Sequence, residues 1–221
     1  MSFAELNASS FGHIKDFYIS EFEDILSKVI VCYNLMVNEK VLLKNDENAI
    51  RDILLINYLK DNTVRQAVKL TDYLFDREVP EDRTIGRTDI KIQTLNTFLD
   101  TSAYYIIECK RLDSVNTAGT TGLNAKYIEN GIFRFVSNTY STYNRVNGMI
   151  GFVVEPLDIN KNIDAINGLL KTNFTQVGVV QDLQYFEITP GWDFSYCSTH
   201  TVGGTSIIIY HLMLDYSLNI A

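Results

Sequence analysis

The first part of the chain has apolar residues at helical spacing. From Ile14 to Lys40 they recur every three or four positions with charged residues between them, which predicts one long helix. Asn45 and Asp46 can cap a helix, and the apolar positions after them predict a second helix that runs to about Tyr58. A third, short helix is expected over residues 63–71.

After residue 72 the period of the pattern changes from that of a helix to that of a strand. Strands are expected over residues 73–79, 86–93 and 102–111, and their short connections indicate an antiparallel meander. A helix is expected over 123–140. A nearly continuous apolar run then predicts a strand over 148–154 that is buried on both faces.

The rest of the chain forms a β-rich C-terminal extension. A helix is expected over 158–173, and strands over 179–188, 194–200 and 205–214 either extend the sheet or form a small flap. The chain contains no internal repeat and no linker, so we expect a single α/β domain. Its parts are an N-terminal helical region over 1–44, a core over about 45–156 and the C-terminal extension over 157–221.

Composition and charge narrow the class of protein. The 221 residues are 46% hydrophobic and 21% charged, as in ordinary globular domains. Apolar runs are strand-sized, so no membrane contact is expected, and the N-terminus lacks the pattern of a secretion signal. Three widely separated cysteines fit a reducing compartment, and we expect a cytoplasmic protein. The net charge of −8 means that any surface that binds nucleic acid must be local.

The strand expected over 102–111 ends in the residues that carry candidate chemistry. Because alternate residues of a strand share a face, Glu108 and Lys110 point the same way, about 7 Å apart along the backbone. Asp89 lies on the preceding strand, and a hairpin would bring it beside Glu108. Two carboxylates and the backbone carbonyl of Cys109 would make an oxygen-rich site suited to Mg²⁺ or Mn²⁺.

This pattern resembles the PD-(D/E)XK, or restriction-endonuclease-like, nuclease superfamily. The resemblance rests on Asp89, on Glu108-Xaa-Lys110 and on the order of a helix, three strands, a helix and a strand, over about residues 45–156. Thr88 stands where the family's name has proline. The resemblance implies an α/β fold with a restriction-endonuclease-like αβββαβ core around a mixed central sheet, here with added N-terminal helices and the β-rich extension.

Further residues follow from the resemblance. The superfamily often has an additional glutamate on the helix before the three strands, and Glu47 matches it by type and location. Its implied role is to support the metal. The helix after the Glu-Xaa-Lys strand often contributes a polar or basic group. Together with nearby basic residues, the candidate nucleic-acid contacts are Arg87, Arg111, Lys126, Tyr127 and Arg134.

The resemblance implies a metal-dependent nuclease that hydrolyses phosphodiester bonds, most of all in DNA, in restriction or in defence against mobile DNA. Asp89 and Glu108 would bind Mg²⁺ or Mn²⁺. Lys110 would orient or deprotonate the attacking water, or stabilise charge in the transition state, and the sequence leaves these roles open. Cleavage of both strands of a duplex would want a homodimer, which places two sites on two strands, and a protein partner could supply basic surface. The alternative is a non-catalytic binding or assembly subunit with the same fold, which the acidic charge favours.

Simpler interpretations exist for the same residues. Glu108 and Lys110 could form a surface salt bridge, but the apolar residues before them place the strand in the core, where unpaired charges are unfavourable. Cys197, His200 and His211 could bind zinc, but they lack a convincing fourth ligand, so ordinary core or surface histidines are expected. Cys109 is expected on the opposite face from Glu108, as a small buried residue.

Overall fold

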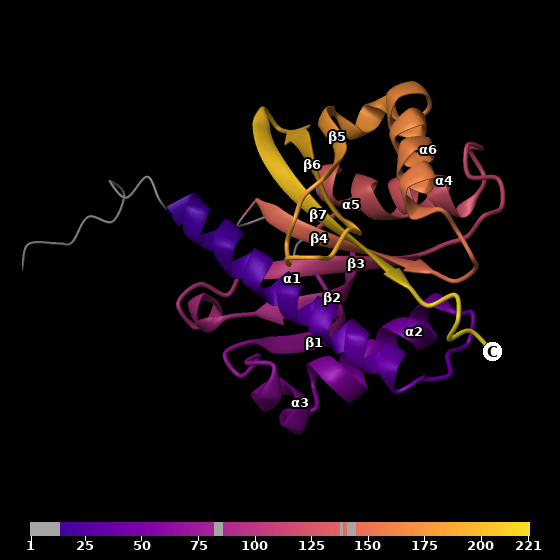
Figure 1. Cartoon of the computed structure of the whole chain (residues 1–221). Coiled ribbons are helices and arrows are strands. Elements are labelled where there is room, and N and C mark those ends of the chain that lie inside the picture. Colours follow the sequence, from indigo (N-terminus) through magenta and orange to yellow (C-terminus); the bar gives the residue numbers. More distant parts are fainter. Residues whose placement is uncertain (1–13, 82–85, 138, 141–144) are drawn as a thin grey trace, which may run out of the picture.

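The protein is a mixed α/β structure built on one seven-stranded sheet, with helices on both faces (Figure 1). The computed structural model describes residues 14–81, 86–137, 139–140 and 145–221. The strands are β1 (Leu74–Pro80), β2 (Arg87–Gln93), β3 (Tyr104–Leu112), β4 (Val146–Val153), β5 (Val179–Tyr185), β6 (Ser195–Val202) and β7 (Thr205–Asp215). The α-helices are α1 (Ile14–Asn38), α2 (Glu47–Leu54), α3 (Asn62–Ala67), α4 (Leu123–Tyr127), α5 (Phe133–Val136) and α6 (Ile159–Thr172).

The strand order along the sheet is β1-β2-β3-β4-β7-β6-β5. The first three strands form the expected antiparallel meander. After α4 and α5 the chain returns as β4, which lies parallel to β3, as a strand that follows a helical crossover usually does. All eight residues of β4 are buried, which confirms the prediction from its apolar run.

The C-terminal strands extend the sheet and do not form a separate flap. β7 lies parallel to β4 in the middle of the sheet, and β6 and β5 continue outward from it in antiparallel pairs. Beyond β7, the N–H of Ala221 donates to the carbonyl of Leu43, next to the start of α2. The last residues of the chain therefore support the segment that leads into α2 (Figure 1).

Three helices differ from their predicted extent. The short helix expected over 63–71 is α3, which ends at Ala67. The second predicted helix begins as expected, with the Asp46 side chain accepting the Ala49 N–H, but after Leu54 it continues as a π-turn over Leu55–Leu59. The helix expected over 123–140 consists of α4, a π-turn over Ile128–Ile132, and α5, and it ends at Val136. The chain leaves the helix there, and the ring of Tyr140 turns back into the core. Residue 138 of the predicted helix lies outside the described part of the chain.

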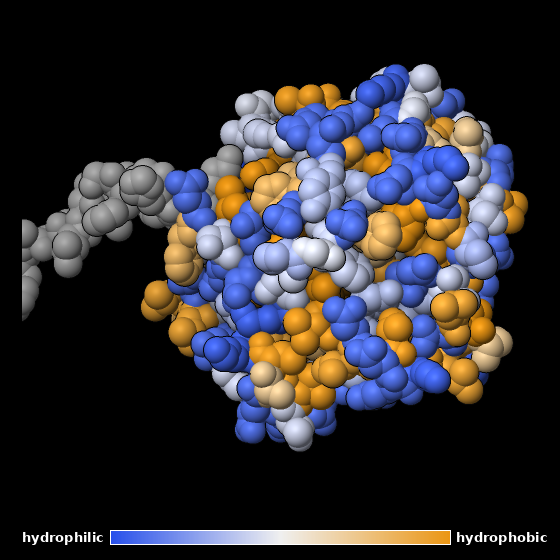
Figure 2. All heavy atoms as spheres, in the orientation of Figure 1, coloured by the Kyte–Doolittle hydropathy of each residue, from blue (hydrophilic) through white to orange (hydrophobic). Residues whose placement is uncertain are grey.

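The sheet separates two hydrophobic cores. α1 runs diagonally across one face, where it packs with α2 (Figure 1), and α4 and α6 cover the other. On the face seen in Figure 2, hydrophobic side chains lie in patches separated by hydrophilic ones. Within the described ranges, no helix is both long and apolar enough to cross a membrane.

The two histidines of the C-terminal strands are buried in a chain of hydrogen bonds. The Ser198 hydroxyl lies 2.9 Å from His200 Nε2 and 2.8 Å from His211 Nε2. The other ring nitrogens lie 3.0 Å from the Val177 carbonyl and 2.8 Å from the Tyr127 hydroxyl. Because all four ring nitrogens have partners within the protein, these are core histidines, as expected, and not zinc ligands.

Candidate active site

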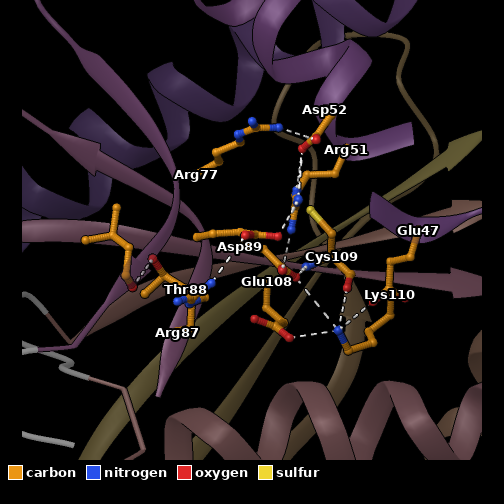
Figure 3. Close-up of polar contacts among 12 residues, drawn as sticks. Glu47, Arg51, Asp52, Arg77, Arg87, Thr88, Asp89, Glu108, Cys109 and Lys110 are labelled. Carbon is orange, nitrogen blue, oxygen red and sulfur yellow. Dashed lines mark hydrogen bonds and ion pairs between the residues drawn. The ribbon is translucent and has the colours of Figure 1, made fainter. Parts of the chain in front are cut away.

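The candidate site lies where β2 and β3 separate. Their paired residues end at Ile90 and Ile107, so Asp89 and Glu108 are the first residues beyond the ladder. From this point the backbone N–H groups of β3 on that side have no strand to pair with. The Asp89 carboxylate takes the place of the missing strand, since its Oδ2 accepts the N–H of Cys109 at 2.8 Å (Figure 3).

A second carboxylate caps the same edge of β3. Oε2 of Glu47, in the first turn of α2, accepts the N–H of Arg111 at 3.0 Å. Its other oxygen, Oε1, lies 3.0 Å from Nζ of Lys110 (Figure 3). The Asp46 cap at the start of α2 fixes the helix end that carries Glu47. Glu47 therefore joins the site that the sequence predicted for it.

The Lys110 ammonium lies among four oxygen atoms. Its Nζ is 2.7 Å from Glu108 Oε1, 2.6 Å from the Cys109 carbonyl and 3.0 Å from Glu47 Oε1. Asp89 Oδ2 is 3.8 Å away. The prediction that Glu108 and Lys110 share a face, with Asp89 beside them, is confirmed.

The donor set fits a hard divalent cation. Asp89, Glu108 and the Cys109 carbonyl supply only oxygen atoms, and Mg²⁺ is commonly held by one or two carboxylates plus water. Among the described residues, no group of three or more His, Cys, Asp and Glu side chains is placed to hold a metal ion. Protein groups would therefore supply only part of the shell, and the Lys110 ammonium lies close to the same oxygens that a metal would use.

Glu108 is fully buried and heavily hydrogen-bonded. Besides Lys110, it accepts Arg134 Nη1 at 2.8 Å on Oε1 and the Tyr140 hydroxyl at 2.5 Å on Oε2. Burial raises the pKa of Glu108 to about 7, and the charge of Asp89 adds to this shift, while Lys110 and Arg134 oppose it. The three donors therefore hold a carboxylate in a place where burial alone would favour its neutral form.

The pKa of Lys110 is likewise subject to burial and to neighbouring charges, but here the charges outweigh burial. Burial alone would lower its pKa, but the neighbouring carboxylates of Glu108, Asp89 and Glu47 raise the pKa of Lys110 above its ordinary value. The side chain is therefore a fixed positive charge near neutral pH, and its N–H groups donate hydrogen bonds to the surrounding oxygens.

Arg51 is a member of the site that the sequence analysis missed. Its side chain is 2% exposed, and Nη1 lies 3.0 Å from Asp89 Oδ1, while Nη2 lies 2.8 Å from Asp52 and 3.1 Å from Glu78 (Figure 3). Arg51 follows Glu47 by one helical turn, so both side chains belong to one face of α2. That spacing was a signal that could have identified it.

The predicted basic contacts divide into two groups. A pocket of about 340 Å³ opens beside Lys110, and Arg111, Lys126 and Arg134 line it. Arg87 is not among its lining residues and pairs instead with Glu78 at 3.4 Å. The structure therefore brings three of the predicted contacts to one opening and leaves Arg87 outside it.

The prediction that Tyr127 contacts nucleic acid is wrong for this structure. The side chain is fully buried, and its hydroxyl lies 2.8 Å from His211 Nδ1. Neighbouring positions on a helix point in different directions, so Lys126 faces the solvent while Tyr127 faces the sheet. The abundance of tyrosine in this chain partly reflects core packing.

Comparison of the chain with protein-family models, with curated proteins and with solved structures gives no match. A functional argument for this chain therefore rests on the geometry and chemistry of its own residues.

Proposed function

We propose that the protein is a metal-dependent nuclease that hydrolyses phosphodiester bonds, most of all in DNA. The observation that carries this proposal is the convergence of Asp89, Glu108 and the Cys109 carbonyl on the charged end of Lys110. The helix, three-strand, helix, strand order and the separation of β2 from β3 at the acids support a restriction-endonuclease-like core.

Each residue has a defined part in this proposal. Asp89 and Glu108 hold Mg²⁺ or Mn²⁺ together with the Cys109 carbonyl, and Glu47 supports this shell from α2. When bound, the metal supplies a more acidic water and a positive charge for the phosphoryl oxygen. Arg51 holds Oδ1 of Asp89, while Oδ2 accepts the Cys109 N–H and lies 3.8 Å from Lys110 Nζ.

Lys110 serves as an electrostatic group in this proposal. Its Nζ donates hydrogen bonds to Glu108, to Glu47 and to the Cys109 carbonyl, and an ammonium held in this way is unsuited to removing a proton from water. A fixed ammonium beside the phosphate stabilises the negative charge that develops in the transition state. Of the roles that the sequence left open for Lys110, charge stabilisation is therefore the one we adopt.

The surroundings of the site favour catalysis over the alternative of a non-catalytic subunit that only assembles into a larger complex. Arg111, Lys126 and Arg134 lie at the pocket beside the acids, which suits a phosphate substrate. A non-catalytic subunit would have little physical reason to gather three acids around one buried ammonium. The role in restriction or in defence against mobile DNA, and the cytoplasmic location, follow only from the resemblance and from composition.

The test is cleavage of DNA by purified protein at increasing Mg²⁺ or Mn²⁺. Glu108→Gln keeps the size of the side chain and removes its charge, whereas Glu129→Gln makes the same change on the exposed side of the π-turn. We expect metal-dependent cleavage in the wild type and in Glu129→Gln, and at least a hundredfold loss in Glu108→Gln. Equal rates in all three proteins would show that the nuclease activity arises elsewhere.

A further inference from the structure

We infer that this site takes a single, unpaired strand of nucleic acid and not an intact duplex. The inference rests on the proposed function and adds to it the class of substrate. It is carried by three properties of the site: how deeply the acids lie, which groups form the walls of the pocket, and where positive charge is available.

The acids that would hold the metal are recessed. The Glu108 side chain is 0% exposed, that of Lys110 10% and that of Asp89 15%. Glu47, at 32%, is the most exposed carboxylate around the ammonium. Of this cluster, Glu47 and Lys110 line the pocket, so a phosphate that enters it approaches the recessed acids past these two residues.

The pocket is small, and its lining is of mixed charge. It includes Asp46 and Glu47 at the start of α2 together with Lys126, Asn130 and Arg134. Its volume of about 340 Å³ is at the low end of the range for small-molecule sites, roughly 300–1,000 Å³. Such a space suits one nucleotide-sized group of a flexible strand. In a duplex, a nucleotide would have to leave the base stack before it could enter such a space.

Positive charge gathers at this opening. Of the pocket residues, Lys126 is exposed and Arg111 and Arg134 are half-buried, whereas Lys110 is buried among carboxylates. Arg134 is itself paired with Glu108, as Arg77 and Arg87 outside the pocket are with other acids. With a net charge of −8, the protein can engage few phosphates, which suits a short stretch of one strand.

The groups that line the pocket favour recognition of the backbone over the bases. Among the described residues that line it there is no aromatic ring on which a base could stack. Leu123 is the apolar member of the lining, while the basic groups suit phosphate oxygens. Little dependence on base sequence is therefore expected.

The experiment compares three fluorescently labelled DNAs of one sequence: a single strand, the blunt duplex, and a duplex with an unpaired arm. Cleavage is measured in Mg²⁺, and binding is measured by anisotropy with Glu108→Gln, which does not depend on turnover. We expect the single strand to be cleaved and bound at least tenfold better than the duplex, with cleavage of the third DNA confined to its arm.

The outcomes separate this inference from the proposed function. Cleavage of the duplex at the rate of the single strand would overturn the inference and leave the nuclease intact. Absence of cleavage of every DNA, with preferential binding of the single strand, would overturn the nuclease and support the inference. Equal binding of both forms, or binding of neither, would refute the single-strand site.

The dependence of DNA affinity on salt, and a substitution in the lining of the pocket, give a second test of the single-strand site. With about three phosphate contacts, the slope of log affinity against log salt should be about −2 for a single strand. Lys126→Ala should weaken binding several-fold and reduce the slope by about 0.7. Lys171→Ala, an exposed lysine of α6 paired with Asp182, should change neither quantity. Equal effects of both substitutions would place the binding surface outside the pocket.

Discussion

The Asp89 carboxylate occupies the position that a paired strand would have beside Cys109, with its Oδ2 2.8 Å from the backbone nitrogen of that residue. This bond has two consequences. It satisfies a buried N–H that the separation of β2 from β3 leaves open, and it directs a carboxylate into the space between the two strands. One residue thus completes the edge of the sheet and supplies the proposed site with an acid.

Asp89→Asn should separate these two roles. The amide oxygen can still accept the Cys109 N–H, but the negative charge beside Arg51 and Lys110 is lost. We expect the free energy of unfolding to change by no more than about 2 kcal/mol. Metal binding, measured by calorimetry, and cleavage should both be abolished. Asp164→Asn, an exposed change on α6, is the control, and wild-type activity in Asp89→Asn would contradict the proposed metal site.

Arg51→Met should be strongly destabilising. The substitution removes a buried cation and leaves Asp52, Glu78 and Asp89 without their shared partner. We expect a loss of about 3 kcal/mol in the free energy of unfolding, measured by chemical denaturation. Arg51→Lys should lose less, because it keeps the charge but cannot contact three carboxylates in the same way. A stable Arg51→Met protein would show that the three acids do not depend on it.

Tyr140→Phe should weaken the support of Glu108. The hydroxyl donates to Glu108 and lies 2.8 Å from the carbonyl of Arg87, and Arg134 Nη1 also contacts it. Its removal should lower the free energy of unfolding by about 1–3 kcal/mol and reduce the cleavage rate. The matched change Tyr185→Phe, on an exposed ring of β5, should affect neither quantity. Equal effects of the two variants would remove the proposed role of Tyr140.

The buried histidines should make stability fall in mild acid. Burial lowers the pKa of His200 to about 4 and lowers that of His211 well below its ordinary value. In the unfolded chain both histidines titrate near pH 6.5. Below that pH the unfolded state binds protons that the folded state excludes, so the stability present at neutral pH decreases as the pH falls from about 6.5 toward 4.

Denaturation series between pH 7.5 and 5 measure this effect. Each buried histidine should contribute up to about 1.4 kcal/mol per pH unit to the slope of the free energy of unfolding. His200→Gln should reduce this slope, relative to the wild type, by about 1.4 kcal/mol per pH unit, which corresponds to one fewer proton taken up on unfolding. An unchanged slope in His200→Gln would mean that His200 binds a proton equally in both states.

Much of the site was accessible from the sequence because its geometry is local. A period of two places Glu108 and Lys110 on one face, and the connection over residues 94–103 brings Asp89 alongside. Glu47 was identified through the family resemblance, while the cap at Asp46 predicts only that a helix begins there. The first two relations depend on strand periodicity and on the pairing of consecutive strands, which the pattern of apolar residues indicates.

Other features depend on contacts between distant segments. Arg51 and Tyr140 join the site only when α2 and the chain after α5 meet the sheet, which no local pattern specifies. The burial of Tyr127 follows from β7, whose His211 reaches it from 84 positions away. The position of β7 in the middle of the sheet was likewise beyond local reasoning, since the pattern of a strand does not identify its neighbour.

The central position of β7 sets an order of events during synthesis. β4 is buried on both faces and needs β7 along one edge, yet β7 follows it only after α6, β5 and β6. While the ribosome makes those elements, β1 to β4 have an open, apolar edge that can pair with another chain. The nascent protein thus depends on its late segments, and a stop codon before residue 205 would leave an aggregation-prone sheet in place of a shortened but folded protein.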